Sequence, residues 1–149
     1  MNAHLVELPV EGLTYGHYTI LVSNAQAFTK RTDVIVHASF WSTRLSISQR
    51  SKGDEQEAQF LDRGTGAPLP NVIAIHFLRN WQNGNDRFVG SELMNSDAEG
   101  MLRAPVNARG GEVIWSLTKD GDEFISEEHW IPGGGSRIGI PGPDLRTFL

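Results

Sequence analysis

The chain has 149 residues, which is enough for one domain of ordinary size with a substantial hydrophobic core. Hydrophobic residues make up 39% of the sequence, as in globular proteins and unlike disordered ones. The 13 basic and 18 acidic residues give a net charge of -5, and no basic cluster is present. This charge distribution excludes the electrostatic footprint of a nucleic-acid-binding protein.

Targeting and redox features are absent from the sequence. There is no cysteine, so disulfide bonds, thiolate catalysis and cysteine metal sites are excluded. No apolar run approaches the length of a transmembrane helix, and the first residues lack the pattern of a signal peptide. Strand-like sequence (HLVELPV) begins at residue 4. We therefore expect a fragment of a longer protein, with the targeting signal elsewhere in the parent.

Short strand-like runs follow one another along the whole chain, and no stretch has the period and caps of an amphipathic helix. The runs cover residues 5–10, 17–24, 33–40, 43–48, 57–62, 71–78, 87–94, 101–106, 112–118 and 123–131. Clusters of Gly, Asn, Asp, Pro and Ser separate them. This pattern predicts an all-β fold, an antiparallel β-sandwich.

The alternation of side chains adds two expectations. In residues 112–118, the apolar positions of one face include Trp115, which is therefore predicted to lie in the core. Apolar residues up to Phe40 follow one phase, whereas those from Trp41 to Ile47 follow the opposite phase. A slip of one residue requires a bulge or a crossing between sheets or domains, and we expect a crossing at Phe40–Trp41.

Two turn motifs separate the central runs. Gly64, Gly66 and Pro68 break the chain after the run at residues 57–62. Asp97 and Gly100 bracket a short turn before the run at residues 101–106. Both motifs are predicted to be structural turns.

The order of these segments resembles a known family. LTYGHYTILVSN precedes the long run VIVHASFWSTRLSIS, and DRGTGAPLPNV, DAEG and a closing hairpin follow. This order is similar to that of macroglobulin-like domains in bacterial alpha-2-macroglobulin family proteins, particularly the large Bacteroidetes-type ones. The resemblance covers about residues 5–131. Its separate turns also occur in carboxypeptidase-regulatory-like and other immunoglobulin-like envelope domains, and their order is more specific than any one of them.

The resemblance implies an immunoglobulin-like sandwich of the macroglobulin-domain type. Residues 1–33 would be closing strands of a preceding domain and a connector, residues 34–131 the domain, and residues 132–149 a Gly/Pro-rich linker to the next domain. The function implied is a non-catalytic structural module of a large protein that traps or inhibits proteases in the periplasm or at the outer surface. Its partners would be neighbouring domains and, through the parent, proteases. The family's thioester motif, C-x-E-Q, is absent, so covalent trapping is not expected here.

No catalytic residue, cofactor site or metal site is predicted. Glu127 and Glu128 are adjacent on a strand and face opposite sides, so they cannot flank one glycosidic bond. No serine lies in a G-x-S-x-G turn. The histidines lack the spacing that places metal ligands on one helical face, and strand positions explain them better than a zinc site. They are His4, His17, His37, His76 and His129.

The acidic segment DGDEF (residues 120–124), with Asp97 and Glu99, raises the alternative of a calcium site. The pattern lacks the third acid and the distal glutamate of an EF-hand loop. Asp-Gly is also a strong signal for a hairpin turn. A turn is therefore the preferred interpretation.

The tryptophans raise a rival function, a glycan- or protein-binding immunoglobulin-like module of a surface protein. They are Trp41, Trp81, Trp115 and Trp130. Trp81 lies in the polar segment NWQNGND, where Asn83 and Asn85 complete a candidate interaction surface. Loop tryptophans are equally expected at contacts between domains. The glycine run at residues 133–135 favours a linker over a phosphate-binding loop, since no helix follows it.

Overall fold

The computed structural model describes residues 9–26, 28, 34–52, 55–80, 87–105, 110–132 and 146–147. Within these residues the protein is all-β, with twelve strands and no helix. Every strand pair is antiparallel. The predicted all-β, antiparallel character is therefore confirmed.

The strands follow the predicted apolar runs closely. In chain order they are β1 (Gly16–Ser23), β2 (Ile35–Ser42), β3 (Leu45–Lys52), β4 (Glu55–Asp62), β5 (Ile73–Asn80), β6 (Arg87–Gly90), β7 (Met94–Asn95), β8 (Met101–Pro105), β9 (Gly110–Lys119), β10 (Asp122–Ile125), β11 (His129–Pro132) and β12 (Arg146–Thr147). The runs at 87–94 and 123–131 each form two strands. The run at 5–10 lies mainly outside the described residues, and residues 9–14 form no strand.

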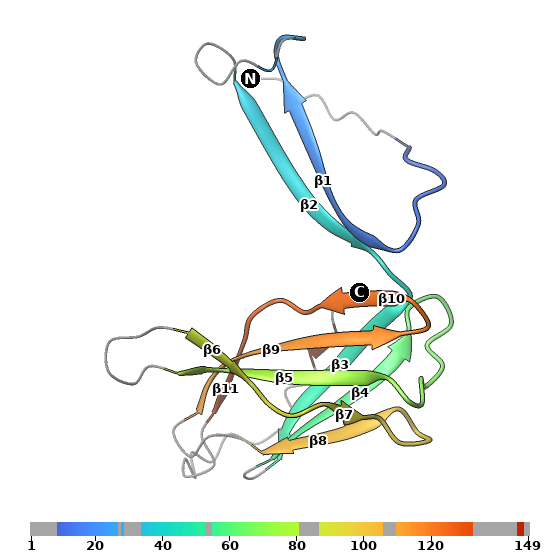
Figure 1. Cartoon of the computed structure of the whole chain (residues 1–149), viewed down its shortest axis with the longest axis vertical. Coiled ribbons are helices and arrows are strands. Elements are labelled where there is room, and N and C mark those ends of the chain that lie inside the picture. The colour runs from blue at the N-terminus through green and yellow to red at the C-terminus, as the bar shows by residue number, and fades with distance from the viewer. Residues whose placement is uncertain are drawn as a thin grey trace. The chain divides into compact units, whose positions relative to one another are not determined.

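The chain divides into two compact units, Met1–Ser42 and Thr43–Leu149. The first contains a two-stranded ribbon in which β1 pairs with β2, with Gly16 opposite Ser42 and Ser23 opposite Ile35 (Figure 1). β2 thus belongs to the ribbon, whereas the sequence suggested that the sandwich begins at residue 34. The cause is the pairing of β2 with β1 along its full length.

The second unit contains two sheets. One has the strand order β12-β3-β4-β8, and the other has the order β10-β9-β5-β6, with β11 also paired to β9 and β7 also paired to β5. Figure 1 shows the sheet of β5 and β9 lying over the sheet of β3, β4 and β8. Because β12 pairs with β3, residues 146–147 return to this unit, although the sequence placed them in a linker. Residues 133–145 of that linker lie outside the described residues.

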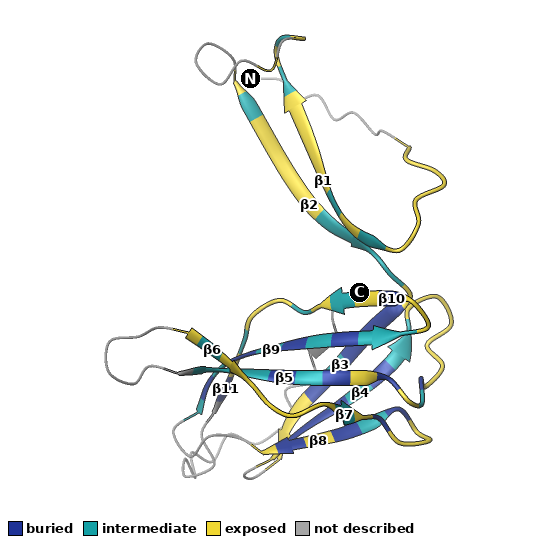
Figure 2. Cartoon of the chain, in the orientation of Figure 1, coloured by how far each residue is buried: buried dark blue, intermediate teal, exposed yellow. Residues whose placement is uncertain are grey.

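Buried residues from both sheets form one hydrophobic core, and Figure 2 shows buried positions on strands of both sheets. Its buried members are Leu45, Ile47, Ala58, Phe60, Leu69, Val72, Ala74, Leu102, Ala104, Trp115 and Leu117. Period-two alternation explains their selection, since successive side chains of a strand point to opposite faces. The pattern along β9 is strict, with alternate residues from Gly111 to Leu117 buried.

The edge strand formed by β10 and β11 contains a bulge. Ile125 pairs with Ser116, and His129 pairs with Val113, so three residues (126–128) lie opposite two (114–115). Ser126 holds the bulge against β9, because its N–H donates to the Trp115 carbonyl and its Oγ accepts from the Trp115 N–H. As in other bulges, the extra residue shifts the side-chain alternation of the strand beyond it.

Candidate interaction surface

The surface predicted from sequence falls on residues that the structure does not describe. Trp81, Asn83 and Asn85 all lie between the end of β5 at Asn80 and the start of β6 at Arg87. An interaction through this segment stays a prediction. The two turn motifs and Trp115 lie in the second unit.

The first turn motif is organised by one carboxylate. Oδ1 of Asp62 accepts hydrogen bonds from the N–H groups of Gly64 (3.0 Å) and Thr65 (2.9 Å) and from the Thr65 hydroxyl (3.0 Å). These bonds with Thr65 are the main reason why the pKa of Asp62 lies below its ordinary value. Gly66 adopts the left-handed conformation (φ 72°), and Pro68 pairs across the hairpin. The motif therefore shapes a turn.

The second turn motif packs against Phe60 and Leu69, which flank the first. Oδ1 of Asp97 accepts from the N–H groups of Glu99 (3.0 Å) and Met101 (2.7 Å). Gly100 has φ 69°, and a Cβ there would lie 2.5 Å from the carbonyl oxygen of Phe60. The Phe60 N–H donates to the Gly100 carbonyl (2.8 Å). Both turns could be predicted from sequence, but the contact of the second turn with Phe60 of β4 could not.

Polar side chains surround Trp115 inside the core. Its indole Nε1 donates to Oε1 of Gln49 (3.0 Å), which also accepts from Nε2 of Gln56 (2.8 Å). The His76 ring lies 4.4 Å from the Trp115 ring, centroid to centroid. Oε1 of Gln56 and Nε2 of His76 are buried and have no hydrogen-bond partner within the described residues. Burial lowers the pKa of His76 to about 4, so this imidazole is neutral at pH 7.

The remaining histidines are dispersed. His17 and His37 lie on the ribbon, His17 beside Trp41 with 4.7 Å between ring centroids, and His129 lies on β11. His4 lies outside the described residues. Among the residues that the structure describes, no group of three His, Asp or Glu side chains is arranged to hold a metal ion.

The segment considered for calcium forms the hairpin between β9 and β10. Asp120 (φ 51°) and Gly121 (φ 81°) are its two central residues, both in the left-handed region that such turns require. Asp122 is buried, and its Oδ2 accepts from the Arg44 N–H (2.7 Å). Asp97 belongs to a different turn. The acids thus serve separate hairpins rather than one cation site.

A buried carboxylate on the outer face of β4 was not foreseen from the sequence. Glu57 is only 1% exposed, and its oxygens contact Arg50 (Nε, 2.6 Å), Arg103 (Nε, 3.2 Å) and Lys52 (Nζ, 3.7 Å). The hydrogen bond from Arg50 is the largest reason why its pKa lies below the ordinary value. Because the three cations converge on one carboxylate, this cluster ties β3, β4 and β8 together.

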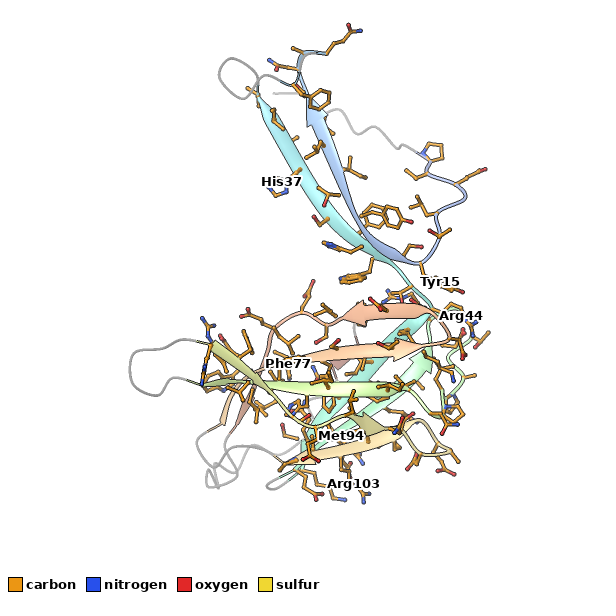
Figure 3. The ribbon with its side chains drawn as sticks, viewed as in Figure 1. Tyr15, His37, Arg44, Phe77, Met94 and Arg103 are labelled. Carbon is orange, nitrogen blue, oxygen red and sulfur yellow. The ribbon has the colours of Figure 1, made fainter. Side chains whose placement is uncertain are left out.

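Several apolar side chains lie on the outer face of the β10-β9-β5-β6 sheet of the second unit. Strand pairing places one set of outward residues on it: Ile73, Ile75, Phe77, Ile114, Ile125, Phe88 and Trp130. Figure 3 labels Phe77 among the side chains of this sheet. Arg79 forms ion pairs with Glu112 and with Glu128 (3.6 Å) on the same face. The continuous apolar run NVIAIHFL gave a signal for this face, since it makes β5 apolar on both sides.

Comparisons of the chain with protein-family models, with curated proteins and with solved structures found no match. Among the residues described, no helix is long and apolar enough to cross a membrane.

Proposed function

We propose that the chain is a non-catalytic structural module that joins β-domains within a large bacterial alpha-2-macroglobulin-like protein of the cell envelope. The parent would trap or inhibit proteases in the periplasm or at the outer surface. This proposal combines the resemblance in segment order with two observations, one on each unit. The observation that carries the interdomain role is the exposed apolar face of the ribbon.

The strand order of the second unit supports an immunoglobulin-like type. Strands β3, β4 and β8 have the order of strands A, B and E, and β10, β9, β5 and β6 have the order of G, F, C and C′. The turns at Asp62 and Asp97 then connect these strands rather than form a reactive site. In agreement with a structural role, their carboxylates are engaged with backbone N–H groups.

The ribbon supports a role in joining domains. Tyr18, Ile20 and Val22 of β1 lie on the same face as their β2 partners, so that this face is almost entirely apolar. The ribbon face is completed by Val36, Ala38 and Phe40. Ile20, Val22 and Val36 are exposed, and Figure 2 colours most of β1 and β2 as exposed. A two-stranded ribbon by itself is marginally stable in water, so an apolar face of this kind needs a further layer of structure packed against it. We assign that layer to a preceding domain of the parent.

Hydrogen exchange on an extended chain tests this role. The matched proteins are residues 1–149 and the same residues preceded in the parent by one further β-domain. Amide protection along β1 and β2 should rise at least tenfold in the longer protein, whereas protection along β9 should not change. Equal protection of β1 and β2 in both proteins would overturn the interdomain role.

A protease assay tests the envelope function separately. Residues 1–149 should form no covalent adduct with any protease of a mixed panel on denaturing gels, because the chain has no cysteine to supply a thioester. The full parent should inhibit at least one protease of that panel. A parent without inhibitory activity would refute the protease-trapping function and leave the module's architecture untouched.

A further inference from the structure

A row of four outward side chains crosses the sheet at one end of β9. Trp130 on β11 pairs with Glu112 on β9, Glu112 forms an ion pair with Arg79 on β5, and Arg79 pairs with Phe88 on β6. The row thus has an aromatic ring at each end, with an acidic and a basic side chain between them. Its four residues come from four different strands, and none of these residues belongs to the hydrophobic core.

Trp130 is the platform of this row. Its side chain is 60% exposed, the highest value for an aromatic residue in the described part of the chain. The indole ring offers a flat apolar surface of large area that loses little conformational entropy on binding. A Trp on the solvent side of an edge strand adds little to the core beneath it. Its exposure therefore leaves a surface available for a ligand.

Arg79 supplies fixed polar groups beside that platform. The guanidinium contacts Glu112, lies 3.6 Å from a Glu128 oxygen and stands 5.7 Å from the centre of the Phe88 ring. The side chains of Arg79 and Glu112 are only 22% and 29% exposed, so their positions are restricted. Each carboxylate has about four acceptor sites, so Glu112 and Glu128 can accept from Arg79 and from a ligand at once.

The chemistry of the row favours one class of ligand. A protein surface packed over it would strip water from a guanidinium and two carboxylates, which is costly unless every group finds a new partner. Sugar hydroxyls are good donors, so they can bond to Glu112 and Glu128, whose carboxylates have acceptor sites beyond those that Arg79 uses. The apolar C–H face of a pyranose ring can lie against the indole. We propose that this row, Trp130–Glu112–Arg79–Phe88, binds a neutral oligosaccharide.

This site differs from the Trp81 segment considered from the sequence and does not rest on the proposed interdomain function. Its test uses residues 1–149 and hexasaccharides of glucose, mannose and N-acetylglucosamine, followed by NMR of the indole and amide signals. At least one sugar should bind with a Kd of about 0.1–1 mM, in the range of small solvent-exposed sites. Signals of the residues in the row should shift on binding, and those of the ribbon should not.

Three variants decide the assignment. Trp130→Ala should weaken binding of that sugar at least tenfold, and Glu128→Gln should weaken it severalfold. Ile125→Ala is the matched control, because Ile125 is an exposed outer-face residue of the same edge but lies outside the row. Its affinity should equal that of the unsubstituted chain. Unchanged thermal unfolding of all three variants ensures that the comparison reports binding.

Several outcomes would overturn the proposal. No binding of any of the three hexasaccharides would do so, as would full affinity in Trp130→Ala. Equal loss in Ile125→Ala would assign binding to the aliphatic part of the face. If uncharged apolar strand peptides bind this face and the sugars do not, the surface is a protein interface.

Discussion

The ribbon and the second unit are built from similar strand sequences, yet their apolar residues differ in exposure to solvent. On the ribbon, Val36 is 56% exposed, whereas Trp115 and Phe60 of the second unit are completely buried. Residues 12–24 and 34–43 also contain no Asp, Glu, Lys or Arg. An apolar face thus requires a second layer before it becomes a core. The four predictions below test this difference, beginning with the largest effect.

Removal of the central side chain of the second unit should have the greatest effect. Trp115→Ala should lower the free energy of unfolding by about 3–5 kcal/mol, because it leaves a cavity and removes a donor to Gln49. Denaturant unfolding followed by circular dichroism measures this value. A midpoint unchanged from that of the unsubstituted chain would show that the indole does not organise the core.

Acid should weaken the second unit through His76. Its pKa is about 4 in the folded state and about 6.5 when exposed, so the unfolded state takes up the proton first. The stability contributed by neutral His76 is complete above pH 6.5 and falls as the pH drops toward 4. The loss should reach about 3 kcal/mol, since each pKa unit corresponds to about 1.36 kcal/mol.

The control for this prediction is His76→Leu, which should flatten the stability profile between pH 6.5 and 4.5. The lowered pKa values of Glu57 and Asp62 cause losses only below their ordinary values of 4.5 and 3.8. A loss of stability between pH 6.5 and 4.5 therefore reports the protonation of His76. An identical slope in the unsubstituted chain and the variant would exclude His76 as its source.

The close approach of Gly100 to the Phe60 carbonyl should make this position sensitive to one added methyl group. Gly100→Ala should destabilise the second unit by about 1–3 kcal/mol, because the new Cβ meets the Phe60 carbonyl and the left-handed φ is strained. Gly66→Ala is the matched control, since Gly66 has a similar φ of 72° but a Cβ there would meet no atom within 4 Å. Thermal unfolding should show the larger loss for Gly100→Ala. Equal losses of stability in the two variants would show that backbone strain, and not the contact with Phe60, causes the destabilisation.

The smallest effect is expected on the ribbon. Ile20→Ser should change the unfolding free energy of the second unit by less than about 0.5 kcal/mol, because Ile20 is exposed and lies in the other unit. Denaturant unfolding monitored at the Trp115 environment provides the measurement. A loss above about 1 kcal/mol would show that the two units unfold together.

Much of the fold could be predicted from local pattern. Period-two alternation located β9 and the burial of Trp115, and the Gly, Pro and Asp positions located the turns at residues 62–68 and 97–100. The phase change at Phe40–Trp41 predicted a crossing at these residues, but β2 stays paired with β1 through Ser42, and the two units divide between Ser42 and Thr43. These features depend only on residues close in sequence.

The rest depends on pairing between distant segments. No local sequence pattern predicts the ion pair between Arg79 and Glu112. The same is true of the ion pairs that Glu57 forms with Arg50, Lys52 and Arg103. The pairing of β2 with β1 could not be predicted either, because the strands of the second unit have a similar alternation of apolar and polar residues. Sequence therefore indicated the strands but not the charged clusters that their pairing creates.

The bulge at residues 126–128 has a consequence for how this surface could arise or vanish. Without the extra residue, the β10 alignment would continue and Trp130 would stand opposite Gly111, on the core side of the sheet. Ile131, now completely buried, would turn outward in its place. A single codon inserted in or deleted from this edge would therefore exchange an aromatic surface for an aliphatic one.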